Sequence, residues 1–299
     1  MTRLLMISII CLLPFLAAGQ QDPMFTKYMF NSLVFNPAYA GSQGNVDVNA
    51  SFRRQWIGID GSPATILLST EGALNDKNIG LGLTLFHDRI GVERRTDVST
   101  NYSYIIDLPS GRLLLGLKAG MALFGFNFAD LQADQLDPYY QQTNSPANLY
   151  FGTGVLYQHD VFFVALATPN LIAVDLNGND LFPTFIKRHF YAQTGAWIDL
   201  GDSGMQFRPS LLLSFQEAAP VQAHLNAGLL LNEYFAMGVS YRTGDALNAS
   251  VTIYPNSHLR IGLGYDFTVS KLRPYTDATF EVMVGYSFGE QVTKIDNPR

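Results

Sequence analysis

The sequence predicts an all-β fold, a transmembrane up-and-down antiparallel β-barrel of about fourteen strands that follows a signal peptide and a periplasmic N-terminal segment. The first supporting observation is alternation: in Thr279–Phe288 the aromatic and aliphatic side chains fall on one face of an extended strand and the small or polar ones on the other. The second is that this pattern recurs along most of the chain. The third is that short and long connections alternate between the segments.

The segments with this alternation are about ten residues long each, as expected for membrane-spanning strands. They are Asn45–Arg54, Ala64–Ala73, Asn78–His87, Thr96–Asp107, Arg112–Phe124, Leu149–Gln158, Val161–Thr168, His189–Leu200, Met205–Gln216, Val221–Leu231, Tyr234–Arg242, Ala246–Tyr254, His258–Phe267 and Thr279–Phe288.

The connections after the even-numbered segments are short and rich in turn residues. The long connections all follow odd-numbered segments; they are Gln55–Pro63, Asp88–Arg95, Gly125–Asn148, Pro169–Arg188 and Thr268–Ala278. Outer-membrane barrels have short turns in the periplasm and longer loops outside. We therefore expect a barrel in the cell outer membrane with both termini in the periplasm, the last segment pairing with the first.

The N-terminus resembles an export signal. Residues 1–19 hold a basic Arg3, an apolar run from Leu4 to Leu16 and a small-residue end, so we expect a secretory signal peptide there. Cys11 is the only cysteine and lies inside this signal, so no disulfide is expected in the mature protein. The formal net charge of -6 and the lack of a basic run argue against nucleic acid as a partner.

The predicted organisation is a signal peptide (1–19), an N-terminal periplasmic or plug segment (20–44), the barrel (45–288) and a C-terminal periplasmic tail (289–299). A soluble barrel or sandwich also alternates. The glycine-rich polar face and the aromatic residues near segment ends, Phe124 and Phe126 among them, favour the membrane barrel. Side chains alone would not fill a lumen of about fourteen strands. The candidates for a plug are Gln20–Gly44 and the Gly125–Asn148 loop.

Residues that suggest catalysis or metal binding have ordinary explanations. The pairs His87-Asp88 and His159-Asp160 lie at segment ends, where adjacent side chains point in opposite directions, so we interpret them as rim or turn groups and expect no enzyme. An outer-membrane hydrolase remains a third alternative. The loop Asp175–Asp180 could bind calcium but has no following glutamate for bidentate ligation, so no metal or cofactor is predicted. Glycine pairs such as Gly80 and Gly82 are expected to face the lumen and let the sheet curve.

The N-terminal motifs carry a family resemblance. Tyr28-Met29-Phe30-Asn31, Asn36-Pro37-Ala38-Tyr39-Ala40-Gly41 and the run from Arg54 to Pro63 resemble the opening signature of the PorP/SprF family of type IX secretion system membrane proteins. The resemblance implies a non-catalytic outer-membrane component of the Bacteroidota type IX secretion and gliding machinery. The partners it implies, besides outer-membrane lipid, are a periplasmic ring component or peptidoglycan-binding lipoprotein, or the C-terminal domain of a secreted surface adhesin.

The candidate site follows from these motifs. We expect a set of residues that either binds a partner or seals the barrel: Asn36, Pro37, Ala38, Tyr39, Ala40, Gly41, Gln55, Trp56 and Gly58. The alternative function is a porin-like channel for small solutes.

Overall fold

The computed structural model describes residues 30–74, 78–126, 147–176, 186–201, 204–217 and 219–289. The predicted signal peptide, the tail beyond Gly289, residues 127–146 of the candidate plug loop and most of the Asp175–Asp180 loop lie outside the described residues.

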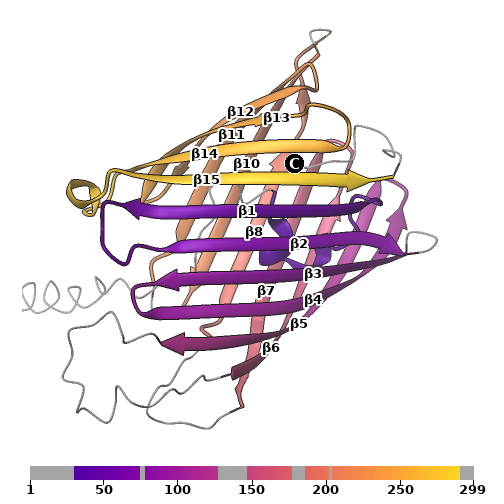
Figure 1. Cartoon of the computed structure of the whole chain (residues 1–299). Helices are drawn as coiled ribbons and strands as arrows, with labels where there is room; N and C mark the ends of the chain where they lie inside the picture. The colour runs from indigo at the N-terminus through magenta and orange to yellow at the C-terminus, as the bar shows by residue number, and fades with distance from the viewer. Residues whose placement is uncertain are drawn as a thin grey trace, which may run out of the picture.

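The strands form one closed antiparallel barrel (Figure 1). The fifteen strands of the described residues occupy fourteen positions, because β8 and β9 both pair with β10. They are β1 (Val46–Ile57), β2 (Ala64–Leu74), β3 (Ile79–Ile90), β4 (Glu93–Leu108), β5 (Gly111–Phe126), β6 (Ala147–Gln158), β7 (Phe162–Asp175), β8 (His189–Ala196), β9 (Ile198–Asp199), β10 (Met205–Gln216), β11 (Gln222–Leu231), β12 (Phe235–Arg242), β13 (Ala246–Ile253), β14 (Leu259–Thr268) and β15 (Ala278–Phe288). Within the described ranges, three short helical turns accompany them: α2 (Ser32–Phe35), η2 (Pro37–Tyr39) and η5 (Arg273–Tyr275).

Closure occurs between the first and last strands, which lie side by side in Figure 1. Their register runs from Val46 paired with Phe288 to Arg54 paired with Phe280. The predicted closed barrel is confirmed. We call the end with the β2–β3 and β4–β5 turns, where β1 begins and β15 ends, the turn end, and the opposite end the loop end.

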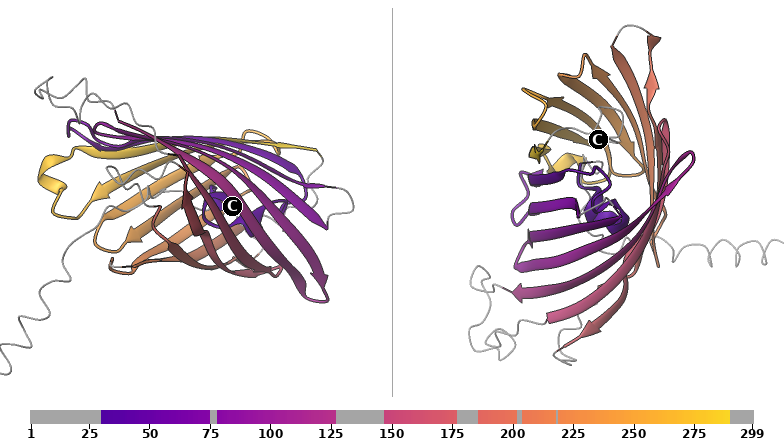
Figure 2. Two further views of the ribbon diagram at one scale, coloured as in Figure 1. Left: turned by 90° about the horizontal axis from the view of Figure 1, so that it is seen from below. Right: turned by 90° about the vertical axis from the view of Figure 1, so that its right-hand side faces the viewer.

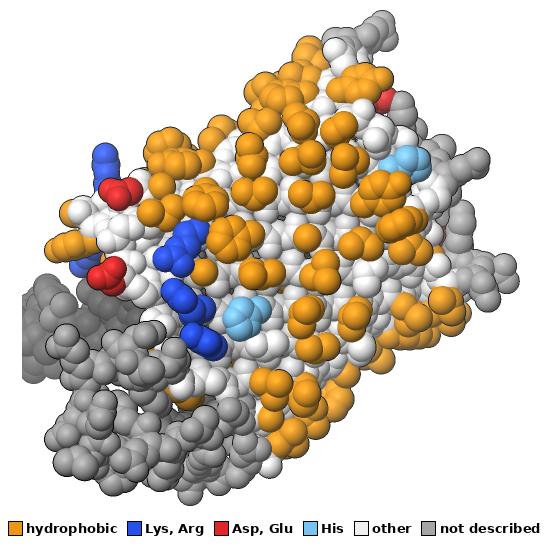
Figure 3. Space-filling model, in the orientation of Figure 1, with side chains coloured by type: hydrophobic (Ala, Val, Ile, Leu, Met, Phe, Trp, Pro, Cys, Tyr) orange, Lys and Arg blue, Asp and Glu red, His pale blue; other side chains and the backbone are white. Residues whose placement is uncertain are grey.

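The two faces of the wall differ as the alternation predicts. Large apolar side chains project from the outer surface over most of the described face in Figure 3, and charged side chains gather at its left margin. On β15, Val282 and Val284 are exposed, whereas Glu281 and Met283, which alternate with them, are buried in the barrel. Among the described residues, no helix is long and apolar enough to cross a bilayer.

Outward aromatic residues gather near both ends of the strands. Tyr286 and Phe288 contact each other at the turn end with ring centroids 4.7 Å apart, and Tyr265 and Phe267 do so at the loop end at 4.6 Å. These positions suit the aromatic girdles of a membrane barrel. Phe124 departs from the prediction, because it points inward and packs with Ala122 and Tyr150.

Two predicted connections are wrong. The Asp88–Arg95 loop is strand, since β3 and β4 stay paired up to Ile90 and Glu93 and only two residues join them. The polar residue Asp88, with which the predicted loop begins, is part of β3. Its carboxylate faces the lumen and accepts a 2.6 Å hydrogen bond from the Thr65 hydroxyl. The strand expected to end at Thr168 continues to Asp175, and the register of β6 against β7 shifts between Phe151 and Thr153. Pro169 lies in this irregularity, where a strand tolerates proline.

Ion pairs inside the barrel join strands β1, β12, β14 and β15. Arg53 is 1% exposed and lies 2.7 Å from Asp266 and 3.4 Å from Glu281. Arg242 lies 3.6 Å from the same Asp266 carboxylate and 2.6 Å from Asp245. Because buried charges are costly unless paired, these contacts fix the relative positions of four strands at the loop end of the lumen.

We predict that Asp266→Asn destabilises the barrel by about 3 kcal/mol, because it leaves two buried arginines with too little negative charge. Urea unfolding in detergent micelles, followed by tryptophan fluorescence, measures this free energy. The matched control is Asp60→Asn on the exposed β1–β2 connection, which should change it by less than about 0.5 kcal/mol. Equal unfolding midpoints for Asp266→Asn and the native protein would contradict the assigned role of this network.

Candidate functional site

Residues Phe30–Gly44, which we call the inner segment, lie inside the barrel. In the right-hand view of Figure 2 the indigo segment lies within the ring of strands. Its residues are buried from Phe30 to Ser42, apart from the half-buried Val34. Successive turns shape it, with hydrogen bonds from the Asn36 amide to the Ser32 carbonyl (2.9 Å) and from the Ser42 amide to the Tyr39 carbonyl (2.9 Å).

Asn36 and Pro37 set the middle of the inner segment. Asn36 has extended backbone (φ -143°, ψ 116°), the conformation favoured before proline. Its side-chain oxygen accepts a 2.9 Å hydrogen bond from the Ala38 amide, and its side-chain amide donates one of 3.2 Å to the Val155 carbonyl of β6. Pro37 opens η2, where its missing N–H costs nothing. Gly41, with φ +69°, then turns the chain toward β1.

The wall facing this segment carries a row of small residues across four neighbouring strands. Gly80 of β3 pairs with Ser103 of β4, Ser103 pairs with Gly116 of β5, and Gly116 pairs with Gly154 of β6. We call these four residues the small-residue row. Because directly paired residues lie side by side on one face of a sheet, the row forms a shallow strip on the lumen wall.

The inner segment approaches the three glycines of this row so closely that an added Cβ atom at any of them would overlap it. A Cβ atom added to Gly80 would lie 1.9 Å from the Ala40 carbonyl oxygen. One added to Gly116 would lie 2.2 Å from the Ala38 nitrogen, and one added to Gly154 would lie 2.0 Å from the Asn36 side-chain oxygen. The glycines therefore do more than let the sheet curve: they allow backbone contact between the wall and the inner segment.

Hydrogen bonds from the wall hold the segment in place. The Ser103 hydroxyl donates to the Ala40 carbonyl (2.5 Å), and Lys118 and Arg112 donate to the carbonyls of Val34 (3.1 Å) and Ser42 (3.0 Å). On the segment's side, the Tyr39 hydroxyl donates to Gln193 of β8 (3.0 Å). The contacts reach from β4 to β8, so the segment is fixed along much of the inner wall.

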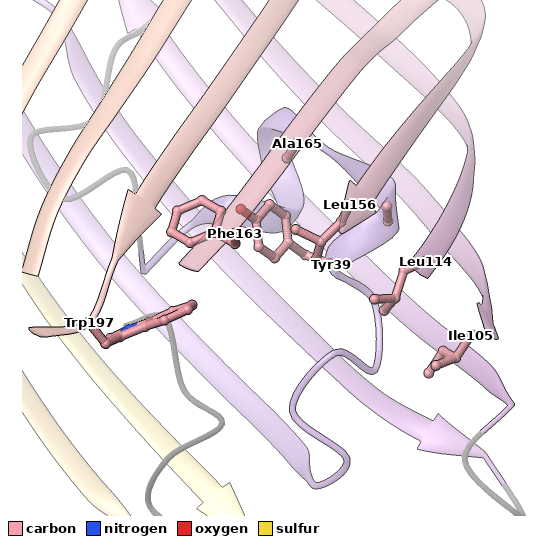
Figure 4. Packing of buried hydrophobic residues seen from close by; sticks show 8 residues of the cluster. Tyr39, Ile105, Leu114, Leu156, Phe163, Ala165 and Trp197 are labelled. Atoms are coloured by element: carbon pink, nitrogen blue, oxygen red, sulfur yellow. The ribbon is translucent and has the colours of Figure 1, made fainter. Parts of the chain in front are cut away.

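Apolar packing completes the site. Ala38 and Tyr39 belong to one buried cluster, with Tyr39 pointing toward Phe163 of β7 (Figure 4). The other members of this cluster are Ile105, Leu114, Leu156, Ala165 and Trp197. A second cluster joins Phe35 to four side chains on the wall: Leu67, Phe86, Tyr191 and Leu212. Burial of these apolar side chains stabilises the inner segment in its position inside the barrel.

The predicted site residues separate into two groups. Asn36 to Gly41 lie together in the lumen, whereas Gln55, Trp56 and Gly58 lie at the loop end, at the last residues of β1 and just beyond it. Trp56 has φ 53° and lies where the register between β1 and β15 shifts; its amide donates to the Thr279 hydroxyl (3.0 Å). A non-glycine residue with positive φ is strained, and such strain often marks a functional position.

The two histidine pairs are not brought together. His87 faces outward and contacts the Thr96 hydroxyl (2.9 Å), while Asp88 faces the lumen. His159 stacks on Phe162 beside the β6–β7 turn (4.9 Å between centroids). Within the part of the chain that the structure describes, no group of three or more His, Cys, Asp or Glu residues could hold a metal ion.

The closed wall, its apolar outer surface and its aromatic girdles define an outer-membrane β-barrel. Solved structures with a similar fold include the monoaromatic hydrocarbon channel CymD (TM-score 0.51, 11% identity, 91% of this chain and 95% of that chain) and Omp33 from Acinetobacter baumannii (TM-score 0.47, 10% identity, 83% and 100%). At these identities the likeness concerns the fold alone. The comparison with curated protein sequences gave no match.

Residues 17–286 match the family model described as type IX secretion system membrane protein PorP/SprF, and the chain belongs to this family. It is therefore an outer-membrane component of type IX secretion. Since barrels of this membrane keep their short turns in the periplasm, the turn end faces the periplasm and the loop end faces outward.

Sequence reasoning did not find the wall side of the site. Gly116, Lys118 and Gln193 contact the inner segment, yet none belongs to a motif. Their common signal is small or polar character at inward positions of the alternation, which identifies a lumen face but not what lies against it.

We predict that Gly116→Ala loosens the inner segment, because the added methyl group would overlap the Ala38 backbone. Overpacking of this kind costs about 1–3 kcal/mol. In protein produced from Gln20 onward, a Ser42→Cys change places one thiol at a buried position of the inner segment. Gly116→Ala should raise its rate of maleimide labelling about tenfold.

The matched control for this experiment is Gly125→Ala on the same strand, where an added Cβ meets nothing within 4 Å. It should leave the labelling rate unchanged. Identical rates in the Gly116→Ala and Gly125→Ala proteins would show that the close contact does not hold the segment.

Proposed function

We propose that this protein is a non-catalytic platform of the type IX secretion machinery, which docks a protein partner at its rim and does not conduct solutes. The observation that carries the proposal is the backbone contact between the inner segment and the small-residue row. A segment held by hydrogen bonds from β4 to β8 obstructs passage along that wall. A pore for small solutes would instead need a path lined by side chains and water.

The loop-end rim is the surface that we propose for docking. The Asp277 amide donates to the Ile57 carbonyl (2.8 Å), and the Gly91 amide donates to the Gly61 carbonyl (2.7 Å). These bonds tie the β1–β2 connection to the connections beside it, so the rim presents a fixed shape. A preorganised surface loses less entropy when a partner binds.

Exposed aromatic side chains favour protein binding at this rim. Tyr275 of η5 is 71% exposed, and its backbone lies beside Gly58 on the neighbouring connection. Tyrosine and tryptophan are enriched among residues that dominate binding energy at protein interfaces. The rim faces outward, so the proposed partner is the C-terminal domain of a secreted adhesin. A periplasmic ring component or a peptidoglycan-binding lipoprotein would instead meet the turn end.

We expect Tyr275→Ala to reduce recovery of the partner about tenfold when the tagged protein is isolated from native outer membranes, because it removes an exposed aromatic contact. Mass spectrometry identifies and quantifies what is recovered.

The matched control is Tyr234→Ala, because Tyr234 is 68% exposed in the turn between β11 and β12, at the other end of the barrel. It should leave adhesin recovery unchanged. Loss of a periplasmic protein with Tyr234→Ala, and no loss with Tyr275→Ala, would contradict docking at the loop end.

A further inference from the structure

Three arginines on the outer face of the barrel form a row at the loop end. They are Arg54 on β1, Arg89 on β3 and Arg94 on β4. Arg54 and Arg89 both pair with Ala64 of β2, which separates them, and Arg89 pairs directly with Arg94. We call these three residues the arginine row. In Figure 3 positively charged side chains gather at the loop-end margin of the apolar surface.

The alternation of the strands decides which arginines face outward. Arg54 follows the inward Arg53, and Arg94 precedes the inward Arg95. The inward members have carboxylate partners: Arg53 lies 2.7 Å from Asp266, and Arg95 lies 3.1 Å from Asp97. Among the described residues, none of the three arginines of the row forms an ion pair.

The pairing of Arg89 with Arg94 is unfavourable for the isolated protein. Side chains at directly paired positions lie about 5 Å apart at Cβ, and like charges there repel each other. Arg54 adds a third positive charge two strands away, with only a methyl side chain between. An anion bound across the row would remove this repulsion.

The depth of the row in the membrane is set by its neighbours. Arg54 pairs with Phe280 of β15, which pairs with Tyr265 of β14, so the arginines share their level with the loop-end aromatic girdle. Four residues along the strands toward the membrane centre, about 13 Å away, the outward positions are Ala50, Leu68, Leu85 and Val98. Aromatic girdles lie at the lipid interface. The arginine row therefore lies at the headgroup level of the outer leaflet.

We propose that the arginine row binds the phosphate groups of a phosphorylated glycolipid in the outer leaflet. Guanidinium groups match phosphate oxygens with paired hydrogen bonds, and two or three of them on neighbouring strands suit a headgroup with two phosphates. The acyl chains of the same lipid would lie on Phe52, Ile66, Leu68 and Leu85, which are exposed on β1, β2 and β3. This site is separate from the inner segment and does not depend on the docking proposal.

The test is a titration of purified protein in detergent micelles with diphosphorylated lipid A, with bound lipid counted by native mass spectrometry. Replacing all three arginines by glutamine should weaken binding at least about tenfold, since each basic residue near a lipid surface contributes measurably. The control replaces Lys187, Lys271 and Arg273 by glutamine, which removes the same charge from exposed positions outside the row. It should change affinity less than about twofold.

Two further arms identify the ligand chemistry. Lipid A that lacks one phosphate should bind the native protein more weakly than the diphosphorylated form does. The triple variant should bind the two forms of lipid A with equal affinity. Inorganic phosphate at the same concentration should not compete, because it lacks the acyl chains. Should the triple variant fold poorly by circular dichroism, Arg94→Gln alone is expected to weaken binding about threefold.

The proposal is overturned if the triple variant binds diphosphorylated lipid A as tightly as the native protein. It is also overturned if removal of a phosphate from the lipid leaves its affinity for the native protein unchanged, or if inorganic phosphate competes fully.

Discussion

Lipid supplies no hydrogen-bond partners to a polypeptide backbone, and the pairing of β1 with β15 satisfies this constraint at the point where the sheet closes. This pairing also fixes the inner segment. The segment ends at Gly44, and β1 begins two residues later at Val46. The chain therefore leaves the lumen and enters the wall within a few ångströms, so the strand that closes the barrel also determines where the segment lies.

A lumen of this width could be filled with large inward side chains or with a separate piece of chain. On the side facing β3 to β6 the protein uses the second solution: Gly80 and Gly116 let backbone pack on backbone, and Gly154 leaves room for the Asn36 side chain. On the side formed by β1, β12, β14 and β15 it uses ion pairs among Arg53, Arg242 and Asp266. These two sides of the inner wall are thus filled by different chemistry.

The alternation of residues predicted the strands, their faces and the closure, because in a membrane barrel the outer face must be apolar along every strand. It failed where a polar residue faces the lumen close to a strand end, as Asp88 does, and where a bulge accommodates Pro169. The motif from Asn36 to Gly41 was visible in the sequence. Its wall partners were not, because Gly80, Ser103, Gly116 and Gly154 become neighbours only through the register of four strands.

Ion conductance across planar lipid bilayers tests most directly whether the inner segment closes the lumen. Protein that begins at Gln20 should insert without steady conductance steps. Protein that begins at Asn45, and so lacks the whole inner segment, should show steady conductance steps under the same voltage and salt. Steady conductance of the same size in both proteins would contradict the account, because the lumen would then be open with the segment in place.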